Sequence, residues 1–267
     1  MSFDPQQPYN DLPELPLPID LETKAVLKQA ILANKALAEL KGAGVLVPNQ
    51  AVLIQSLGLQ EAKLSSEIEN IVTTNDELYR AFANHGEKAD PHTKEVLRYS
   101  DALWHGYDCI QNRNRSLTTN LFEELFQIIK KSQAGVRKTP GTKLANSRNE
   151  VIYTPPEGES VLRDKLANLE RFIYAEDDID PLVKLAVIHY QFEAIHPFTD
   201  GNGRTGRILN ILYLVEQGLL DIPVLYLSRY IIENKNAYYN GLRKVTEEGD
   251  WEAWILYLLR AVEQTAL

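Results

Sequence analysis

The chain has a single cysteine, Cys109, among its 267 residues, so no disulfide can form within it. It has no long uninterrupted apolar run. Its most apolar stretch, ILNILYLVEQGLLDIPVLYL, is broken by four polar residues, which excludes a membrane span: Asn210, Glu216, Gln217 and Asp221. The start, MSFDPQQPYN, lacks the basic and apolar regions of a signal peptide. We therefore expect a cytoplasmic protein with no membrane partner.

Basic residues are in the minority, with 28 Lys and Arg against 37 Asp and Glu and a net charge of −9. This balance argues against a surface for nucleic acid or anionic lipid over the whole molecule, although a local basic pocket is compatible with it. Apolar residues make up 44% and charged residues 24%, as in ordinary globular proteins. The length suits one large domain or one domain with an extension.

Most of the chain has the spacing of amphipathic helices. The pattern predicts helices over 21–41, about 59–71, 76–84, most of 92–133, 181–196, from inside a glycine-rich stretch to Gly218, 227–247 and 250–265. Residues 1–20 are rich in proline and are expected to form an extended arm or a loose tail. Residues 134–158 are punctuated by Gly, Pro, Asn and Ser, and only EVIYT has a strand pattern. The fold class is therefore all-α with a short β-hairpin.

The stretch HPFTDGNGRTGR, residues 196–207, lies between two of the predicted helices. The first helix should end near His196, because Pro197 disfavours helical geometry in the residue before it. The next helix begins within the stretch, and its unpaired N–H groups can bind an anion. Gly201 and Gly203 allow a sharp turn and a close approach of ligand. Two arginines in the first turn oppose the helix dipole, which makes sense if a phosphate chain binds there.

Asp200 and His196 add chemistry to this turn. A carboxylate beside phosphate oxygens is what Mg²⁺ requires. A histidine at the helix end is positioned to take a proton from a nucleophile. Taken singly, such a histidine is more often a cap or a core residue, and a Gly-Asn-Gly sequence is usually only a turn. Their combination within twelve residues favours a functional site.

HPFTDGNGRTGR matches the HxFx(D/E)GNGRxxR signature of Fic-domain proteins at every fixed position. PELPLPIDLETKAVLKQAILANKALAELKG and LQEAKLSSEIENI resemble the N-terminal region of bacterial Fic proteins, and ENKNAYYNGLRKVTEEGDWEAWILYLLRAV resembles their C-terminal end. The resemblance implies the all-helical Fic fold. It places an N-terminal region over 1–95 and a catalytic core over 96–267, with a flap at about 142–154 that aligns a target segment by β-strand addition.

The resemblance also implies an activity, the transfer of AMP from ATP to a Ser, Thr or Tyr hydroxyl of a target protein, with release of pyrophosphate. ATP is then a substrate and Mg²⁺ a cofactor. By the same resemblance His196 deprotonates the hydroxyl, Phe198 anchors the loop and Asp200 holds Mg²⁺. Arg207 faces the γ-phosphate. The nucleotide-binding residues are expected to be Gly201, Asn202, Gly203, Arg204, Thr205, Gly206 and Arg207, with Tyr238 and Tyr239 at the adenine, unless these two tyrosines only pack helices together.

A second motif, SSEIEN, resembles the inhibitory sequence (S/T)xxxE(G/N) of the family, with Ser65, Glu69 and Asn70 at the fixed positions. On a helix, Ser65 and Glu69 share one face. A bidentate pair between Glu69 and Arg207 would leave ATP in an unproductive pose. We therefore expect an autoinhibited enzyme. Its inhibitory motif precedes the catalytic motif in the chain, as in the second of the family's three classes. Self-adenylylation is expected on release, and removal of AMP from targets is left open.

Two alternatives accompany this interpretation. A phosphotransferase of the same superfamily would carry a bulkier, basic residue in place of Gly203, and a regulatory nucleotide-binding module would need neither His196 nor Asp200.

The segment HGYDC brings His105, Asp108 and Cys109 close in sequence, but neighbours on one helix are poorly placed to form a thiol nucleophile. No feature indicates a nucleic-acid partner. The oligomeric state is not readable, and a homodimer is compatible with the sequence.

Overall fold

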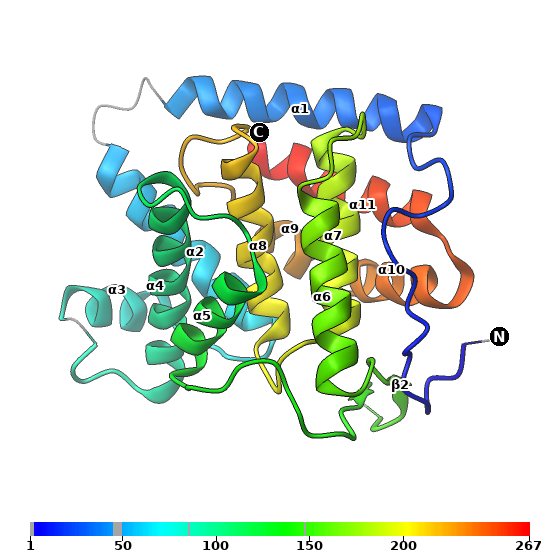
Figure 1. Ribbon diagram of the computed structural model, residues 1–267. Helices are drawn as coiled ribbons and strands as arrows, with labels where there is room; N and C mark the ends of the chain where they lie inside the picture. The colour runs from blue at the N-terminus through cyan, green and yellow to red at the C-terminus, as the bar shows by residue number, and fades with distance from the viewer. Residues whose placement is uncertain (1–2, 45–49, 85, 147) are drawn as a thin grey trace.

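The computed structural model describes residues 3–44, 50–84, 86–146 and 148–267, and over these residues the chain is mostly helical (Figure 1). The expected all-α class with one short hairpin is confirmed. The elements are α1 (Lys24–Gly44), α2 (Gln50–Ile68), α3 (Asn75–Ala83), α4 (Pro91–Gln111), α5 (Thr119–Lys130), β1 (Leu144–Ala145), β2 (Val151–Tyr153), α6 (Glu159–Ile173), α7 (Pro181–Ile195), α8 (Asn202–Glu216), α9 (Leu227–Glu233), α10 (Lys235–Glu248) and α11 (Trp251–Ala266).

Two adjacent helices, α7 and α8, form the centre of the molecule. Almost every side chain of both is buried: α7 is apolar on nearly all sides, whereas α8 is apolar in its second half and buries the polar side chains of Asn202, Arg204, Thr205 and Arg207 in its first. The start of α7 is fixed by local residues: Asp180 caps it by accepting from the Leu182 N–H at 2.8 Å, and Pro181 occupies its first turn. The remaining helices surround this pair.

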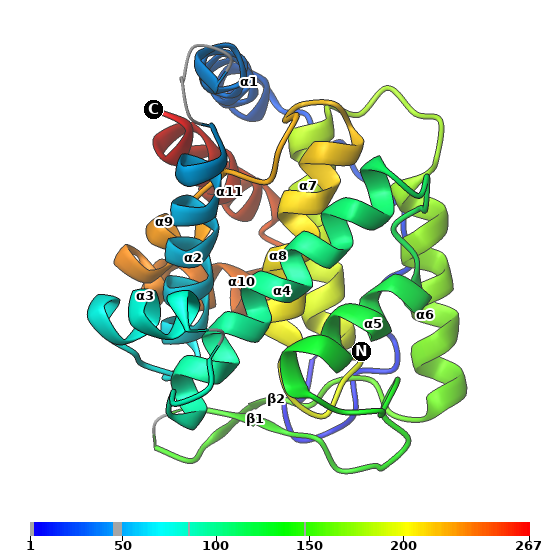
Figure 2. The ribbon, with the colours of Figure 1, turned by 90° about the vertical axis from the view of Figure 1, so that its left-hand side faces the viewer.

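Figure 1 shows α1 lying across one end of the bundle, near the start of α7, whereas the hairpin lies at the other end. There β1 and β2 pair antiparallel, with Leu144 opposite Tyr153 and Ala145 opposite Val151. Figure 2 shows α2 and α4 side by side on the flank of α8, as their contacts require. Both strands fall within the expected flap at 142–154, of which residue 147 lies outside the described part of the chain.

The proline-rich arm is bound to the body rather than loose. Leu12 and Leu15 are buried, and the side chain of Asn168 on α6 pairs with both backbone groups of Leu15 at 2.9 Å. Lys165 donates to the Leu12 carbonyl at 2.8 Å. Nearer the N-terminus, the Tyr9 N–H donates to the Thr154 carbonyl beside β2. The expectation of an arm that wraps the body is therefore correct.

Several predicted helix boundaries are wrong. The helix expected at about 59–71 begins at Gln50 and ends at Ile68, and the helical stretch over 92–133 is interrupted between Gln111 and Thr119. The helix expected over 227–247 is two helices, which meet at Asn234. A further helix, α6, was not predicted. The boundary drawn at 95/96 falls inside α4, which packs against both α2 and α8.

Helices long and apolar enough to span a bilayer are absent from the described residues.

Candidate active site

The signature turn begins at His196, which has a left-handed backbone with φ of 50° at the end of α7. This backbone geometry is unfavourable for any residue other than glycine, so neighbouring groups must hold His196 in place. Arg137 does so: its Nε donates to the His196 carbonyl at 2.8 Å, and its backbone N–H donates to the Pro197 carbonyl at 2.8 Å. Phe198 then enters the core and stacks on Phe126, with ring centroids 4.4 Å apart.

The turn is closed at its far end by Asn202, the first residue of α8. Its side-chain oxygen accepts from the Phe198 N–H, and its amide donates to the Phe198 carbonyl, both at 2.8 Å. Gly201 has a left-handed φ of 75°, which only glycine adopts without strain. The Thr205 hydroxyl donates to the Gly201 carbonyl. The motif residues Asn202 and Thr205 therefore shape the turn, and the N–H groups at the start of α8 are presented by this frame.

His196 is half-buried, and its Nδ1 has no hydrogen-bond partner. Burial, together with the nearby positive charge of Arg137, lowers the pKa of the imidazole to about 4. The side chain is therefore neutral near pH 7. A neutral imidazole can accept a proton, which is the state that a general base requires.

Asp200 is the most exposed charged group of the turn, with 62% of its side chain accessible. Lys130, the last residue of α5, approaches its Oδ2 at 2.7 Å, and the Gly201 N–H donates to Oδ1 at 2.6 Å. Burial raises the pKa of Asp200, but the charges of Lys130 and Arg204 outweigh it, so the net shift is downward. An ionised, accessible carboxylate oxygen at a phosphate-binding turn suits Mg²⁺, whose other ligands are usually phosphate oxygens and water.

Arg204 is buried with 1% of its side chain exposed, and its NH1 is paired with Glu95 of α4. Glu95 also accepts from Lys130 at 2.7 Å, so one carboxylate neutralises two cations. The Nε of Arg204 is buried without a partner. Arg204 therefore keeps one buried N–H donor that no group of the described protein accepts.

The two motifs meet at Arg207, whose side chain is 1% exposed. Its Nε donates to the Ser65 hydroxyl at 2.8 Å, and its NH2 donates to the Ser65 carbonyl at 2.8 Å and to one oxygen of Glu69 at 3.0 Å. The expected bidentate pair between Arg207 and Glu69 is therefore not formed. The guanidinium is shared between the hydroxyl and the carboxylate because Ser65 lies one helical turn before Glu69.

Asn70 has a structural role in this contact. It has a left-handed φ of 62° just beyond α2, and its N–H donates to the Glu67 carbonyl, while that of Ile71 donates to the Ser66 carbonyl. These are the two bonds of a Schellman motif, for which glycine and asparagine are the preferred residues. Asn70 thus ends the helix directly after Glu69 and leaves the carboxylate at its tip.

Glu69 lies directly over the turn at the start of α8. A Cβ placed on Gly203 would overlap Oε1 of Glu69 and lie 2.9 Å from NH1 of Arg207. Any side chain larger than hydrogen at position 203 would therefore displace the carboxylate. Gly206 makes similar room for Glu193 of α7, since its Cβ would lie 2.7 Å from Oε1 of Glu193.

The two candidate adenine-pocket tyrosines differ. Tyr238 is buried, and its hydroxyl pairs with Nε2 of His189 at 2.8 Å within a cluster of aromatic rings that includes Trp254. The packing interpretation therefore fits Tyr238. Tyr239 is 42% exposed and its ring packs edge-on against that of Tyr238, so it is the one of the pair with a free surface.

Sequence reasoning missed four residues of this site: Glu95, Lys130, Arg137 and Glu193. Glu193 has a buried oxygen without a hydrogen-bond partner, and burial raises its pKa to about 7, with the negative charge of Glu69 adding to the shift. The spacing of Glu193, one turn before His196 on α7, was the available signal for it. The other three come from α4, α5 and the segment after α5, and no local pattern connects them with the turn.

His105, Cys109 and Glu124 form a separate cluster in the described part of the chain, with ligand atoms within 4.8 Å of one another. The cluster already contains a cation. Arg115 pairs with both oxygens of Glu124 and approaches the buried Cys109 sulfur at 3.4 Å. The Cys109 sulfur also lies 3.6 Å from Nε2 of His105, and that ring pairs with Glu124 at 3.0 Å. The expectation that neighbours within HGYDC are poorly placed to meet is therefore wrong for His105 and Cys109, although the sulfur is buried.

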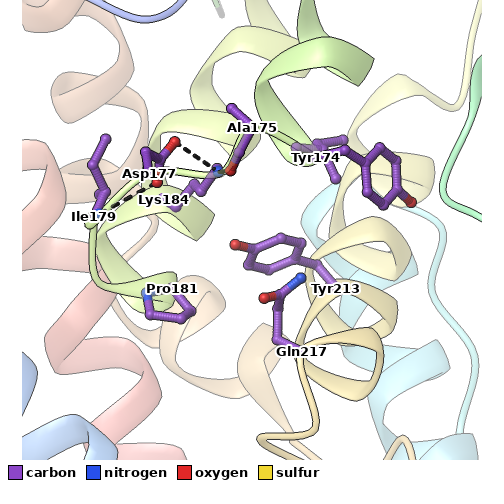
Figure 3. Close-up of a pocket in the computed structure, with 9 residues that line it drawn as sticks. Tyr174, Ala175, Asp177, Ile179, Pro181, Lys184, Tyr213 and Gln217 are labelled. Carbon is purple, nitrogen blue, oxygen red and sulfur yellow. Dashed lines mark hydrogen bonds and ion pairs between the residues drawn. The ribbon is translucent and has the colours of Figure 1, made fainter.

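A surface pocket is drawn in Figure 3, where Tyr213, Gln217 and Lys184 surround a shallow hollow. It lies at the start of α7 and the end of α8, and Lys184 pairs there with Asp177 at 2.9 Å. Because α7 has 15 residues, the hollow is about 20 Å from His196. It is not part of the site described above.

Taken together, the described residues form a mostly helical protein whose two central helices are joined by the turn that carries the signature residues. Two family models match this chain: the Fic/DOC family N-terminal model over residues 27–108 and the Fic/DOC family model over residues 111–214. The chain belongs to the Fic/DOC family.

Relatives agree with this assignment. The chain is 36% identical over 95 residues to a probable protein adenylyltransferase of Aquifex aeolicus, a match that covers 36% of this chain and 27% of that protein. It is 25% identical over 215 residues to the protein adenylyltransferase Fic of Culex quinquefasciatus, covering 80% and 40%. The chain thus spans well under half the length of these relatives. A Fic family protein of Desulfovibrio desulfuricans G20 shares the fold, with a TM-score of 0.75 at 18% identity over 92% of this chain and 74% of that one.

Proposed function

We propose that this chain is a protein adenylyltransferase that moves AMP from ATP to a Ser, Thr or Tyr hydroxyl of a target protein and releases pyrophosphate. The observation that carries the proposal is the meeting of two distant motifs at Arg207. A guanidinium at the start of a helix, held by a removable carboxylate directly over an anion-binding turn, is suited to a regulated polyphosphate site. The curated relatives, which are named protein adenylyltransferases, support the same chemistry.

In this proposal each residue of the turn has one task. Neutral His196 accepts the proton of the target hydroxyl as the oxygen attacks the α-phosphorus. The N–H groups at the start of α8, with Arg204 and Arg207, hold the phosphates in line. Asp200 would hold Mg²⁺, which supplies positive charge to the phosphate oxygens. Tyr239 and the free edge of the hairpin are the candidates for adenine and target contacts.

The contact between Glu69 and Arg207 is proposed to keep the enzyme inactive. While Glu69 occupies the space over Gly203, Arg207 cannot bind the γ-phosphate and the triphosphate cannot lie along the turn. Glu69→Gly should therefore increase self-adenylylation at least tenfold, because transition-state contacts with phosphates are each worth a few kcal/mol.

Intact-mass spectrometry after incubation with ATP and Mg²⁺ tests this. The Glu69→Gly variant should gain about 329 Da per AMP, whereas a phosphotransferase would add about 80 Da and a binding module nothing. The double variant Glu69→Gly/His196→Ala is the control and should stay unlabelled. Equal labelling of wild type and Glu69→Gly would remove the autoinhibition part of the proposal, and no AMP adduct on any substrate would remove the activity.

The phosphotransferase alternative has one observation against it. A basic side chain at position 203 would have to displace Glu69, whereas glycine fits beneath it. Removal of AMP by a water near Glu69 is a further activity to test on the same samples. AMP-modified protein incubated with wild type should lose the adduct, and the Glu69→Gly variant should not remove it, if Glu69 positions that water.

A further inference from the structure

Lys130 lies outside both motifs, yet it touches the turn at two places. Its Nζ is 2.7 Å from Oδ2 of Asp200 and 2.7 Å from Oε1 of Glu95. Its aliphatic stem packs on Gly201, since a Cβ there would lie 3.4 Å from Lys130 Cδ. The side chain is 23% exposed. The ammonium group is therefore held beside the start of α8, where phosphates are proposed to bind.

The two carboxylates around Lys130 are not equivalent. Glu95 is also paired with the buried guanidinium of Arg204, which anchors it. Asp200 is largely exposed, and Arg204 NH2 approaches its Oδ1 only to 3.6 Å. Asp200 can thus change partners at small cost, whereas Glu95 keeps both cations in place.

Resting on the proposed function, we propose that Lys130 is a further nucleotide-binding residue, which neutralises Asp200 in the nucleotide-free protein and pairs with the phosphates when Asp200 takes up Mg²⁺. The Lys130 ammonium and a Mg²⁺ ion at about 2.1 Å would compete for Oδ2 of Asp200, because two cations at one oxygen repel each other. The released ammonium stays tethered by Glu95 next to the phosphate-binding turn. No bond is made or broken in this exchange of ion pairs.

This arrangement predicts two effects of opposite sign when the charge of Lys130 is removed. Without Mg²⁺, Asp200 has lost the ammonium that neutralised it and repels the phosphates, so the affinity for nucleotide falls. With Mg²⁺, the metal no longer competes with Lys130 for Asp200, so less Mg²⁺ is required. A side chain that only supported the fold would shift both measurements in the same direction or neither.

The test uses calorimetric binding of a non-hydrolysable ATP analogue to the Glu69→Gly protein. Lys130→Gln should raise the Kd about tenfold in EDTA, a loss typical of one charged hydrogen bond, and should lower the Mg²⁺ concentration for half-maximal binding about threefold. Lys130→Arg should keep the EDTA affinity within about twofold, because it keeps the charge. The exposed neighbour Lys131, as Lys131→Gln, is the matched control and should change neither value.

The EDTA effect should also shrink at high salt, because it is an attraction between charges that ions screen. Unchanged affinity and Mg²⁺ requirement in Lys130→Gln, or equal losses with and without Mg²⁺, would overturn the role of Lys130. In either case AMP transfer by the Glu69→Gly protein would leave the proposed function intact. If the Glu69→Gly protein bound no nucleotide, the proposed function itself would fail.

Discussion

Two titratable residues of α7, one helical turn apart, have pKa values shifted in opposite directions. Burial and Arg137 lower that of His196 to about 4, and burial and Glu69 raise that of Glu193 to about 7. The same loss of hydration acts on both, and the sign differs because the charged form is a cation in one and an anion in the other. Near pH 7 the site thus contains a neutral base beside a carboxyl group close to its titration midpoint.

His196 should therefore stay neutral to far lower pH than an ordinary histidine, whose pKa is about 6.5. We expect its imidazole resonances to show a midpoint near pH 4 in an NMR titration of protein with labelled histidines. A midpoint above 6 for His196, assigned with the His196→Ala protein, would contradict the burial argument and weaken the case for a neutral base.

Glu193 contributes to the pH dependence of stability. Its pKa is raised in the folded state, so the folded protein binds more protons than the unfolded one between about pH 4.5 and 7, and this stability is lost as the pH rises through 7. Glu193→Gln mimics the protonated acid. The free energy of unfolding of Glu193→Gln, taken relative to that of wild type, should therefore be about 2 kcal/mol higher at pH 8 than at pH 5. Urea unfolding at the two pH values measures this difference, and a pH-independent difference would contradict it.

Among the helices, α2 carries Ser65 and leads into Glu69, the residue proposed to be inhibitory, and it is held by a buried carboxylate of its own. Glu61 accepts from the Tyr99 hydroxyl of α4 at 3.2 Å and from both the N–H and the hydroxyl of Ser228 on α9. Burial raises the pKa of Glu61, whereas these donors lower it. A buried acceptor shared by three helices fixes α2 strongly, because removing it leaves the donors unpaired.

Glu61→Ala should loosen α2 and release Arg207 even though Glu69 is still present. We expect self-adenylylation to rise severalfold, but less than in Glu69→Gly, since loss of such a contact destabilises docking by roughly 1–3 kcal/mol. Labelling with ATP and Mg²⁺ measures the rise, and Lys63→Ala on the same helix is the control. Labelling of Glu61→Ala at the wild-type level, in protein with a normal melting curve, would show that α2 is held mainly by other contacts.

The helices also show where sequence patterns suffice and where they do not. The ends of α7 could be predicted because the signals for them, Asp180 and Pro181 at the start and Pro197 after the end, lie directly beside the helix in the sequence. The break between α9 and α10 was missed because Asn234 stops the first helix by donating to the Tyr230 carbonyl from both its N–H and its side chain, in the middle of a periodic pattern. For α6 the signal was present, in Leu162, Leu166 and Leu169, but charged residues between them obscured it.

Over the whole molecule, the residues encoded in a motif could be predicted and the groups that serve them could not. Ser65, Glu69 and Arg207 come together as the family resemblance implies, although Arg207 contacts Ser65 and one oxygen of Glu69 instead of forming the expected bidentate pair. Lys130 and Arg137 reach the turn from the end of α5 and the segment after it, and only packing around Phe126 and Phe198 brings that region to the site. Their positions depend on tertiary contacts, which a single sequence does not reveal.

The arm over residues 3–20 also depends on tertiary contacts, because buried side chains form hydrogen bonds with its backbone. Asn168→Ala would leave both the N–H and the carbonyl of Leu15 unpaired, and two unpaired buried groups destabilise a protein by about 3 kcal/mol. For a chain of this size that corresponds to a fall in Tm of roughly 6–12 °C, measurable by calorimetry. Asn236→Ala, an exposed substitution in α10, should leave Tm within about 2 °C. If Asn168→Ala melted at the wild-type temperature, water would be able to replace Asn168 as the hydrogen-bond partner of the arm. The arm would then not be needed for folding, and the domain would begin at α1.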